Sequence, residues 1–172
     1  MQLIHIPMER IRQLKKEPKT LARAARALRC KMRVEDGGVE IQGDPLAEFT
    51  ARSVITAFGR GFDMDSALSL VDPELYFRSV DIGDVSPKSK RAKQIKARII
   101  GERGRAKRYI EEVSGAKISI YGDTVSFIGD IQQISEAETA INTLIDGGSH
   151  KLAYIRMEAL HRKNKASRSA AF

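Results

Sequence analysis

Apolar side chains in the last third of the chain recur with spacings that predict two strands followed by a helix. Residues 117–121 and 124–128 alternate or are β-branched around the sequence YGD, which is typical of a β-hairpin. From Ile134 to Ile145 the apolar positions recur at helical spacing. Asp130 precedes this run and is a good N-cap, because its carboxylate can accept hydrogen bonds from the free N–H groups of the first turn.

The same order of elements occurs earlier in the chain, at an offset of 86 residues. Residues 30–58 align with residues 116–144 without a gap, and their turn, cap and core positions agree. Asp44 and Pro45 start the helix of the earlier copy, with proline at the first helical position. Chance agreement between two amphipathic segments explains this joint match less well than an internal repeat does.

Two helices and a strand precede each hairpin, so each copy reads strand, helix, helix, strand, strand, helix, which predicts an α+β fold. In the first copy these three elements are a strand at 3–6 and helices at 8–14 and 19–29. In the second copy they are a strand at 76–82 and helices at 89–100 and 105–114. A linking helix at 63–71 and a final helix at 149–163 are also predicted, and we expect the small, basic residues 164–172 to fray.

Two glycines interrupt the helical pattern of the second copy. Gly101 and Gly104 stand where a glycine inside a helix costs roughly 1 kcal/mol relative to alanine. A turn at this point exposes backbone N–H groups, and the next helix presents its positive N-terminal end. We therefore expect the glycines to allow a sugar–phosphate backbone to approach closely. Gly101→Asp combined with Gly104→Asp should then abolish RNA binding while the fold stays intact.

Positive charge is concentrated around these glycines. The 172-residue chain has a net charge of +8, and residues 87–172 carry all of this excess because residues 1–86 balance. Between Lys88 and Arg108 there are 10 basic residues and a single acidic one, Glu102. A charge run is often only a solvated face, but one that brackets a glycine turn favours an anionic partner such as nucleic acid.

The sequence IIGERGRAKRYIEEVSGAKISI (residues 99–120) resembles a type I KH domain, and the resemblance covers residues 75–146. In that family a GxxG loop holds the backbone of about four single-stranded nucleotides. We expect the RNA-binding set to combine this loop, the surrounding cations and the isoleucines of an apolar groove for bases: Arg98, Ile99, Ile100, Gly101, Glu102, Arg103, Gly104, Arg105, Lys107, Arg108, Ile110, Ile118 and Ile120.

One loop residue departs from the family pattern. KH loops usually carry a basic residue at one of the two middle positions, and often at both, whereas here Glu102 is acidic and only Arg103 is basic. We expect weaker phosphate binding for this reason, with compensation from Arg98 and Arg105.

The first copy resembles a KH fold that has lost its loop. The offset places Lys15, Lys16, Glu17 and Pro18 at the GxxG positions, and proline has no N–H to offer. This copy is then structural or protein-binding, although Lys15, Lys16 and Lys19 could touch phosphate loosely. The expected architecture is two tandem type I KH domains with a C-terminal helix: 1–60 degenerate KH domain, 61–75 linker helix, 76–148 KH domain, 149–172 C-terminal helix and basic tail.

The pairing of the two copies narrows the resemblance. A degenerate KH unit, the sequence AFGRGFDMDSALSLVDPELYFRSVDIGDV (residues 57–85) and an intact KH unit are similar to the ribosome-assembly factors called partner of Nob-one. The linker and the IGD motifs carry this similarity. It implies binding to the 3′ region of the small-subunit rRNA precursor, and contact with the Nob endonuclease and with the alpha subunit of the second translation initiation factor.

Other classes of function find little support in the sequence. His5, His150 and His161 lie far apart without a partner motif, so no catalysis and no cofactor are expected. Cys30 is the only cysteine, which excludes an intramolecular disulfide and a cysteine-based zinc site. No apolar run approaches the roughly 18 residues of a membrane span and no signal peptide is evident, which fits a cytoplasmic protein. The alternatives are a protein-interaction scaffold with weak nucleic-acid binding and, less favoured, a single-stranded DNA binder.

The proposed phosphate contacts predict a salt dependence. If about three or four phosphates are neutralised, log affinity for RNA should fall with log salt at a slope of roughly −2 to −3. Titrations of single-stranded RNA at several salt concentrations measure this slope, and a flat response would contradict the arrangement of loop and arginines.

Overall fold

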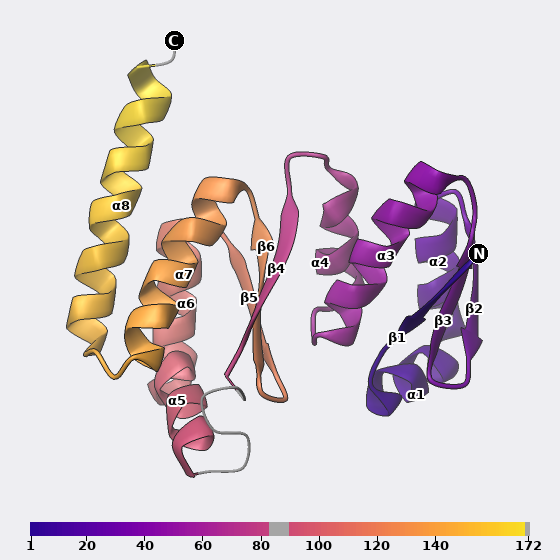
Figure 1. Cartoon of the computed structure of the whole chain (residues 1–172), viewed down its shortest axis with the longest axis horizontal. Helices are drawn as coiled ribbons and strands as arrows, with labels where there is room; N and C mark the ends of the chain where they lie inside the picture. Colours follow the sequence, from indigo (N-terminus) through magenta and orange to yellow (C-terminus); the bar gives the residue numbers. More distant parts are fainter. Residues whose placement is uncertain (83–89, 171–172) are drawn as a thin grey trace. The chain divides into compact units, whose positions relative to one another are not determined.

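The chain folds into two compact units, Met1–Phe77 and Arg78–Phe172. The computed structural model describes residues 1–82 and 90–170, and Figure 1 shows each unit as a three-stranded sheet with helices packed on it. Gly83 and Asp84 of the first IGD motif, Lys88 of the basic run, Ser89 of the predicted helix 89–100 and residues 171–172 lie outside the described residues.

The first unit has the element order expected from the repeat, with its strands in the order β1-β3-β2 and both pairs antiparallel. Its elements are β1 (Gln2–His5), α1 (Met8–Lys16), α2 (Pro18–Ala27), β2 (Lys31–Glu35), β3 (Gly38–Gln42), α3 (Pro45–Gly59), α4 (Met64–Leu68) and a 3₁₀ turn, Ser69–Val71. The segment expected as a linker, 61–75, contains α4, which packs against α2 and α3 of this unit.

The second unit repeats the order, with strands arranged β4-β6-β5. Its elements are β4 (Tyr76–Asp81), α5 (Lys90–Ile100), a 3₁₀ turn (Glu102–Gly104), α6 (Arg105–Ser114), β5 (Lys117–Tyr121), β6 (Thr124–Gly129), α7 (Ile131–Ile145) and α8 (His150–Ala170). None of the helices in the described part of the chain is long and apolar enough to cross a membrane.

The hairpins of the two units share one register. Met32 lies opposite Ile41 in the first hairpin, and Ile118 lies opposite Phe127 in the second. The two pairs are related by the offset of 86 residues, so the sequence repeat is also a structural repeat. The helix that follows each hairpin begins at an aspartate cap: Asp44 accepts from two backbone N–H groups, and Asp130 forms a capping box with Gln133.

An arginine ties the first helix of each unit to the end of a later helix. In the first unit, Arg10 donates to the carbonyl oxygens of Phe58 (2.9 Å) and Phe62, and its guanidinium lies 3.9 Å from the centre of the Phe58 ring. In the second unit, Arg98 donates to the carbonyl oxygens of Leu144 (3.0 Å) and Gly148. Each guanidinium thus binds one carbonyl near the end of the later helix and one in the turn that follows it.

The C-terminal helix α8 is longer than predicted and belongs to the second unit. Ala153 and Met157 are fully buried in the core of that unit, where α8 covers α6 and α7 on the side away from the sheet (Figure 1). The expectation that residues from 164 onward fray is wrong for 164–170, because α8 continues to Ala170.

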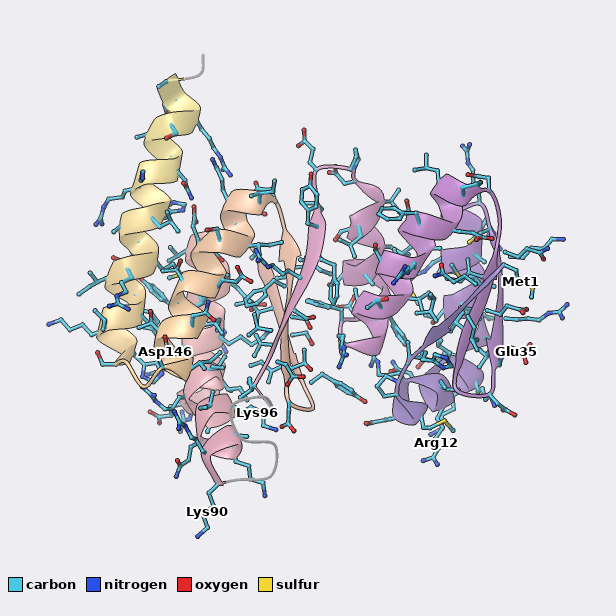
Figure 2. All side chains as sticks on the ribbon, in the orientation of Figure 1. Met1, Arg12, Glu35, Lys90, Lys96 and Asp146 are labelled. Carbon is cyan, nitrogen blue, oxygen red and sulfur yellow. The ribbon has the colours of Figure 1, made fainter. Side chains whose placement is uncertain are left out.

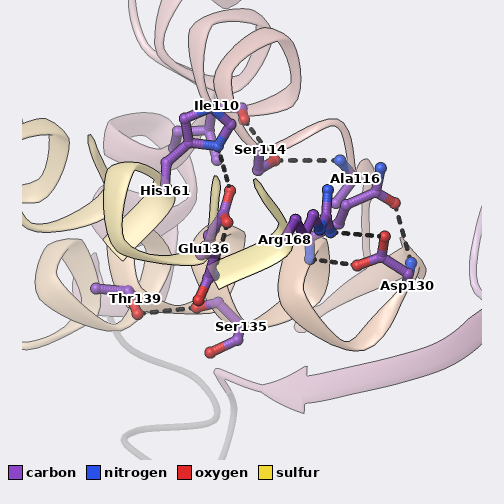
Figure 3. Close-up of polar contacts among 11 residues, drawn as sticks. Ile110, Ser114, Ala116, Asp130, Ser135, Glu136, Thr139, His161 and Arg168 are labelled. Atoms are coloured by element: carbon purple, nitrogen blue, oxygen red, sulfur yellow. Dashed lines mark hydrogen bonds and ion pairs between the residues drawn. The ribbon is translucent and has the colours of Figure 1, made fainter. Parts of the chain in front are cut away.

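Polar contacts hold the distal half of α8 against α7. The Glu136 carboxylate is only 3 % exposed, and His161 Nδ1 lies 2.8 Å from its Oε2. Asn164 donates to Glu136 Oε1 at 2.7 Å, and Arg168 pairs with the cap residue Asp130 at 3.0 Å (Figure 3). A buried carboxylate is costly to leave without partners, so these contacts order a segment that has few apolar side chains.

Substitution of Asn164 should test this anchoring. Asn164→Ala leaves one oxygen of buried Glu136 without its donor, so we expect the free energy of unfolding to fall by about 1–3 kcal/mol. Lys165→Ala, on the exposed side of the same helix, should change it by less than about 0.5 kcal/mol. Urea unfolding of the full chain measures both, and equal effects would contradict the anchoring role.

Candidate nucleic-acid interface

A tight turn joins α5 to α6 at the two glycines. Gly101 has φ 74° and ψ 175°, and Arg103 and Gly104 adopt left-handed conformations with φ 53° and φ 75°. The Gly101 N–H still donates to Ala97 O (2.9 Å), and the Gly104 N–H donates to Gly101 O (3.2 Å). The predicted break between two helices at Gly101–Gly104 is therefore observed.

The two glycines are needed for different reasons. A Cβ on Gly101 would lie 2.6 Å from Ala106 Cβ and 2.8 Å from Ala106 N, so this glycine lets α6 begin directly against the end of α5. At Gly104 the nearest such neighbour is Arg108 Nη2 at 4.0 Å, which leaves the position open. The expectation that aspartate at both positions leaves the fold intact is therefore wrong for Gly101, since its side chain would meet backbone.

The start of α6 has no side-chain cap, although the N–H of its first residue, Arg105, donates to Glu102 O within the turn. Its N-cap is Gly104, and no side chain caps the first turn. The first N–H groups of a helix have no partner within the helix, and they carry its partial positive charge. This end of α6 is suited to a phosphate group.

Three arginines surround this helix end with their side chains exposed: Arg103, Arg105 and Arg108. Arg103 and Arg105 form no ion pair with any residue in 1–82 or 90–170, while Arg108 makes a long contact of 3.4 Å to Arg103 O. Lys107 is partly occupied, since its ammonium lies 3.2 Å from Glu111. The loop thus carries at least two cations available to an anion, beside the exposed carboxylate of Glu102.

Arg98 does not belong to this group of free cations. Its guanidinium donates to the carbonyls at the end of α7, and its own carbonyl oxygen lies 2.8 Å from His150 Nε2. The expectation that Arg98 offsets the negative charge of Glu102 in phosphate binding is therefore wrong. Arg98 instead positions α5 and, through it, the glycine turn.

Most of the isoleucines expected in an apolar groove lie in the core. Ile99 and Ile110 are 0 % exposed and Ile118 is 3 % exposed, so they cannot present a surface to bases and the groove assignment is corrected for them. Ile100, by contrast, is 40 % exposed beside the turn. Ile120 on β5 is partly buried and packs against the core. The apolar surface available at this site thus comes from Ile100 and in part from Ile120.

Lys96 links the site to the hairpin tip and was not singled out from the sequence. Its ammonium lies 2.9 Å from both Gly122 O and Asp123 Oδ1, which joins α5 to the turn between β5 and β6. Lys90 and Lys96, labelled in Figure 2, both project from α5. The partner of Lys96 lies 27 residues away, so no local spacing could mark the contact.

Comparison with known proteins matches this architecture. Residues 76–162 match the family described as "Eukaryotic type KH-domain (KH-domain type I)", in its PNO1 form. The chain is 32 % identical to a chain in the structure of the a/eIF2alpha–aDim2p–rRNA complex from Pyrococcus horikoshii, with a TM-score of 0.85 and coverage of 94 % of each chain. The chain belongs to the PNO1-type KH-domain family.

Two curated relatives show the extent of the match. A KH domain-containing protein of Methanocaldococcus jannaschii is 37 % identical over 76 % of this chain and 58 % of its own length. The pre-rRNA-processing protein pno1 of Aspergillus fumigatus is 30 % identical over 70 % of this chain and 51 % of its own. The chain thus spans about half of the length of the curated relatives that it matches.

The first unit has no equivalent of the GxxG turn. α1 ends at Lys16, α2 starts at Pro18, and only Glu17 separates them, with a negative φ of −122°. Pro18 takes the first helical position and supplies no N–H. The first unit thus shares the element order of the second, but its helix junction is a single residue without glycine.

Other chemistry-bearing groups are accounted for by packing. Tyr109 stacks on Tyr154 with ring centres 4.5 Å apart, and its hydrogen bond to Glu158 raises the pKa of its hydroxyl. Partial burial, followed by the carboxylates of Glu48 and Asp44, raises the pKa of the Cys30 thiol. Within residues 1–82 and 90–170, no group of three or more His, Cys, Asp or Glu side chains is arranged to hold a metal ion.

The difference between the two glycines predicts a difference in stability. Gly104→Ala forces alanine into a left-handed conformation, at a cost of about 1 kcal/mol or more, while Gly101→Ala forces it to φ 74° and ψ 175°, a region essentially confined to glycine that costs about 1–3 kcal/mol. Only Gly101→Ala also overlaps Ala106, so it should reduce the free energy of unfolding by a further 1 kcal/mol or more, roughly. Urea unfolding of the two variants measures this, and equal losses would contradict the packing role of Gly101.

Proposed function

We propose that the second unit binds single-stranded RNA at the turn Gly101–Gly104 and the start of α6. The observation that carries this proposal is the uncapped N-terminus of α6 beside the unpaired, exposed Arg103 and Arg105. Backbone N–H groups, a helix dipole and guanidinium groups together favour a phosphodiester. A GxxG loop is the element with which KH domains hold the backbone of single-stranded nucleic acid.

The remaining residues of the site then have distinct roles. Arg108 and Lys107 add positive charge along α6, while Ile100 and Ile120 offer apolar contact to a base. Ile99, Ile110 and Ile118 support the site structurally, because they are buried in the core and fix α5, α6 and β5 relative to one another.

We propose small-subunit precursor rRNA, at its 3′ region, as the RNA. Support comes from relatives named pre-rRNA-processing proteins and from the structural neighbour that was solved with rRNA. The same neighbour was solved with a/eIF2alpha, which favours the alpha subunit of that initiation factor as a partner of this chain. Contact with the Nob endonuclease rests on the family resemblance alone.

A scaffold function is the second candidate and is favoured by the first unit. We propose that this unit is a degenerate KH domain, since its helix junction contains Pro18 in place of the turn. A unit with a KH-like element order and no loop is suited to holding a protein partner while the second unit holds RNA. The two functions are compatible, and the loop variants below separate them.

Charge changes at the two middle positions of the loop test the RNA site. Arg103→Asp should weaken RNA binding by about tenfold or more, since it removes a charge-assisted contact, and aspartate tolerates the left-handed conformation. Glu102→Lys should strengthen binding several-fold by removing repulsion of phosphate. The measurement is the affinity for labelled RNA of the 3′ end of small-subunit rRNA, beside a scrambled RNA.

The matched control is Glu112→Lys, which makes the same charge change at an exposed position of α6 away from the turn. An equal gain from Glu112→Lys would indicate a general charge effect and contradict the site. Unchanged binding by Arg103→Asp would overturn the RNA proposal and leave the scaffold. Equal affinity for the scrambled RNA would contradict the proposal that the RNA is rRNA, but not the proposal that the turn binds RNA.

A further inference from the structure

The repeat continues beyond the second strand pair and its helix, into α4 and α8. Ala67 of α4 lies 86 residues before Ala153 of α8, and both residues are 0 % exposed. The residues that cap the two helices are related by the same offset. Asp63 accepts from a backbone N–H of α4 at 2.8 Å, and Ser149 accepts from one of α8 at 3.1 Å. α4 is therefore the counterpart of the start of α8.

The two counterparts differ in length. In the first unit, helical structure stops before Asp72, which is extended with ψ 120° because the residue before a proline avoids the helical region. In the second unit, Ala159 stands at the position of Pro73, and α8 continues for more than two further turns. Residues 1–77, all of which are described, thus contain no counterpart of the distal half of α8.

The side of α3 that is left uncovered in this way is an apolar groove. Leu46 is 75 % exposed and Phe49 is 69 % exposed, although both side chains are large and apolar. They line the groove together with another residue of α3 and with residues of the segment after α4: Thr50, Leu70, Val71 and Leu75. Large apolar side chains that gather on an exposed surface mark an interaction site, whereas single ones do not.

The second unit shows how a helix is held at the equivalent position. His161 and Asn164 of α8 contact the buried Glu136 carboxylate at 2.8 Å and 2.7 Å. One turn further on, Arg168 pairs with the helix cap Asp130 at 3.0 Å (Figure 3). The three side chains that the distal half of α8 directs at α7 are thus spaced i, i+3 and i+7.

The corresponding surface of α3 is apolar where α7 is polar. The offset places Leu46 at the position of Gln132 and Phe49 at the position of Ser135. Thr50 takes the place of the buried carboxylate that holds α8. A helix on α3 would therefore be held by apolar contacts and not by donors to a buried carboxylate.

Carboxylates near the groove determine the charge of the occupant that fits it. Asp44 caps α3, as Asp130 caps α7, but it forms no ion pair with any residue in 1–82 or 90–170. Asp72 lines the groove, and its carboxylate accepts from the N–H of the exposed Glu74 at 2.9 Å. No lysine or arginine of the described chain lines the groove. Carboxylates repel phosphate, so this surface favours a protein with basic side chains over RNA.

We propose that this groove binds an amphipathic helix of a protein partner, in the place that the distal half of α8 takes in the second unit. The inference rests on the proposed scaffold function of the first unit and names the class of partner. The helix presents apolar side chains at positions i and i+3 to Leu46 and Phe49, and a basic side chain at i+7 to Asp44. Docking of an apolar helix face into such a groove is a recurrent mode of recognition, and an aromatic side chain such as Phe49 is a typical anchor.

The test uses the full chain and two synthetic peptides of about 15 residues, cross-linked so that they stay helical. The first peptide has alanine throughout except for leucine at i and i+3 and arginine at i+7, and the second has glutamate in place of the arginine. Fluorescence anisotropy of the labelled peptides measures their affinity. The arginine peptide should bind, and the glutamate peptide should bind several-fold more weakly because it meets Asp44.

Variants of the chain locate the peptide. Phe49→Ser installs the residue of the second unit and should weaken binding by about tenfold or more. Ile131→Ser is the matched control, since it removes an equally exposed apolar side chain at the start of α7, and it should leave the affinity unchanged. Because Phe49 is exposed, Phe49→Ser should leave the urea midpoint of the chain close to that of the wild type.

Three results would overturn the helix groove. The first is failure of the arginine peptide to bind, or equal binding by Phe49→Ser and the wild type. The second is a large fall of the urea midpoint in Phe49→Ser, which would give Phe49 a structural role. The third is self-association of the chain alone that Phe49→Ser abolishes, which would assign the groove to a second copy of the chain.

The scaffold function is tested separately, with the purified initiation-factor subunit proposed above as a partner. If that subunit binds the wild type and Phe49→Ser equally and the peptide does not bind, the scaffold function stands and the groove is overturned. If the peptide binds as expected and the subunit does not, the groove stands and serves another partner.

Discussion

In both units, the connection from an arginine on the first helix to the carbonyls after a later helix fixes the architecture. In the first unit Arg10 donates to the carbonyl oxygens of Phe58 and Phe62. In the second unit Arg98 donates to those of Leu144 and Gly148, which lie 86 residues after Phe58 and Phe62. Phe58 and Leu144 lie near the ends of α3 and α7, and Phe62 and Gly148 lie in the turns that follow, so each arginine holds a helix end and its turn together. Because each arginine lies on the helix that leads to the helix junction, this clamp also sets where that junction lies.

The clamp separates two roles among the residues of the proposed RNA site. Arg98 and the buried isoleucines hold α5, α6 and β5, and Gly101 lets the two helices meet closely. What remains for a ligand is the exposed part of the turn: the N–H groups of α6, Gly104 and the arginines beside them. In the proposed site an acidic Glu102 is compatible with phosphate binding, because backbone N–H groups would supply part of the attraction.

Local patterns predicted the elements well and the roles of side chains less well. Alternation and turn residues gave β5 and β6 to within one residue, and the glycines marked the break before α6. Helical periodicity marks an apolar face but does not distinguish core from groove, so Ile99 and Ile110 were misplaced. A hydrogen bond to a carbonyl oxygen distant in the sequence cannot be recognised from the sequence. Arg98 was therefore expected to be available to RNA. The distal half of α8 depends on a buried carboxylate, and apolar periodicity cannot reveal such an anchor.

Comparison of the two units indicates how a duplicated fold can divide its functions. The second unit keeps a helix junction rich in donors and closes its other junction with Gly115 and Gln133. The first unit has lost the donors at Pro18, and after the other end of α2 it has Arg29 where the second unit has Gly115. Neither change alters the strand register, because both fall at helix ends outside the core. Helix ends of this kind can exchange packing for charge without changing the strand register, so they are positions where two copies of one repeated unit can acquire different contacts.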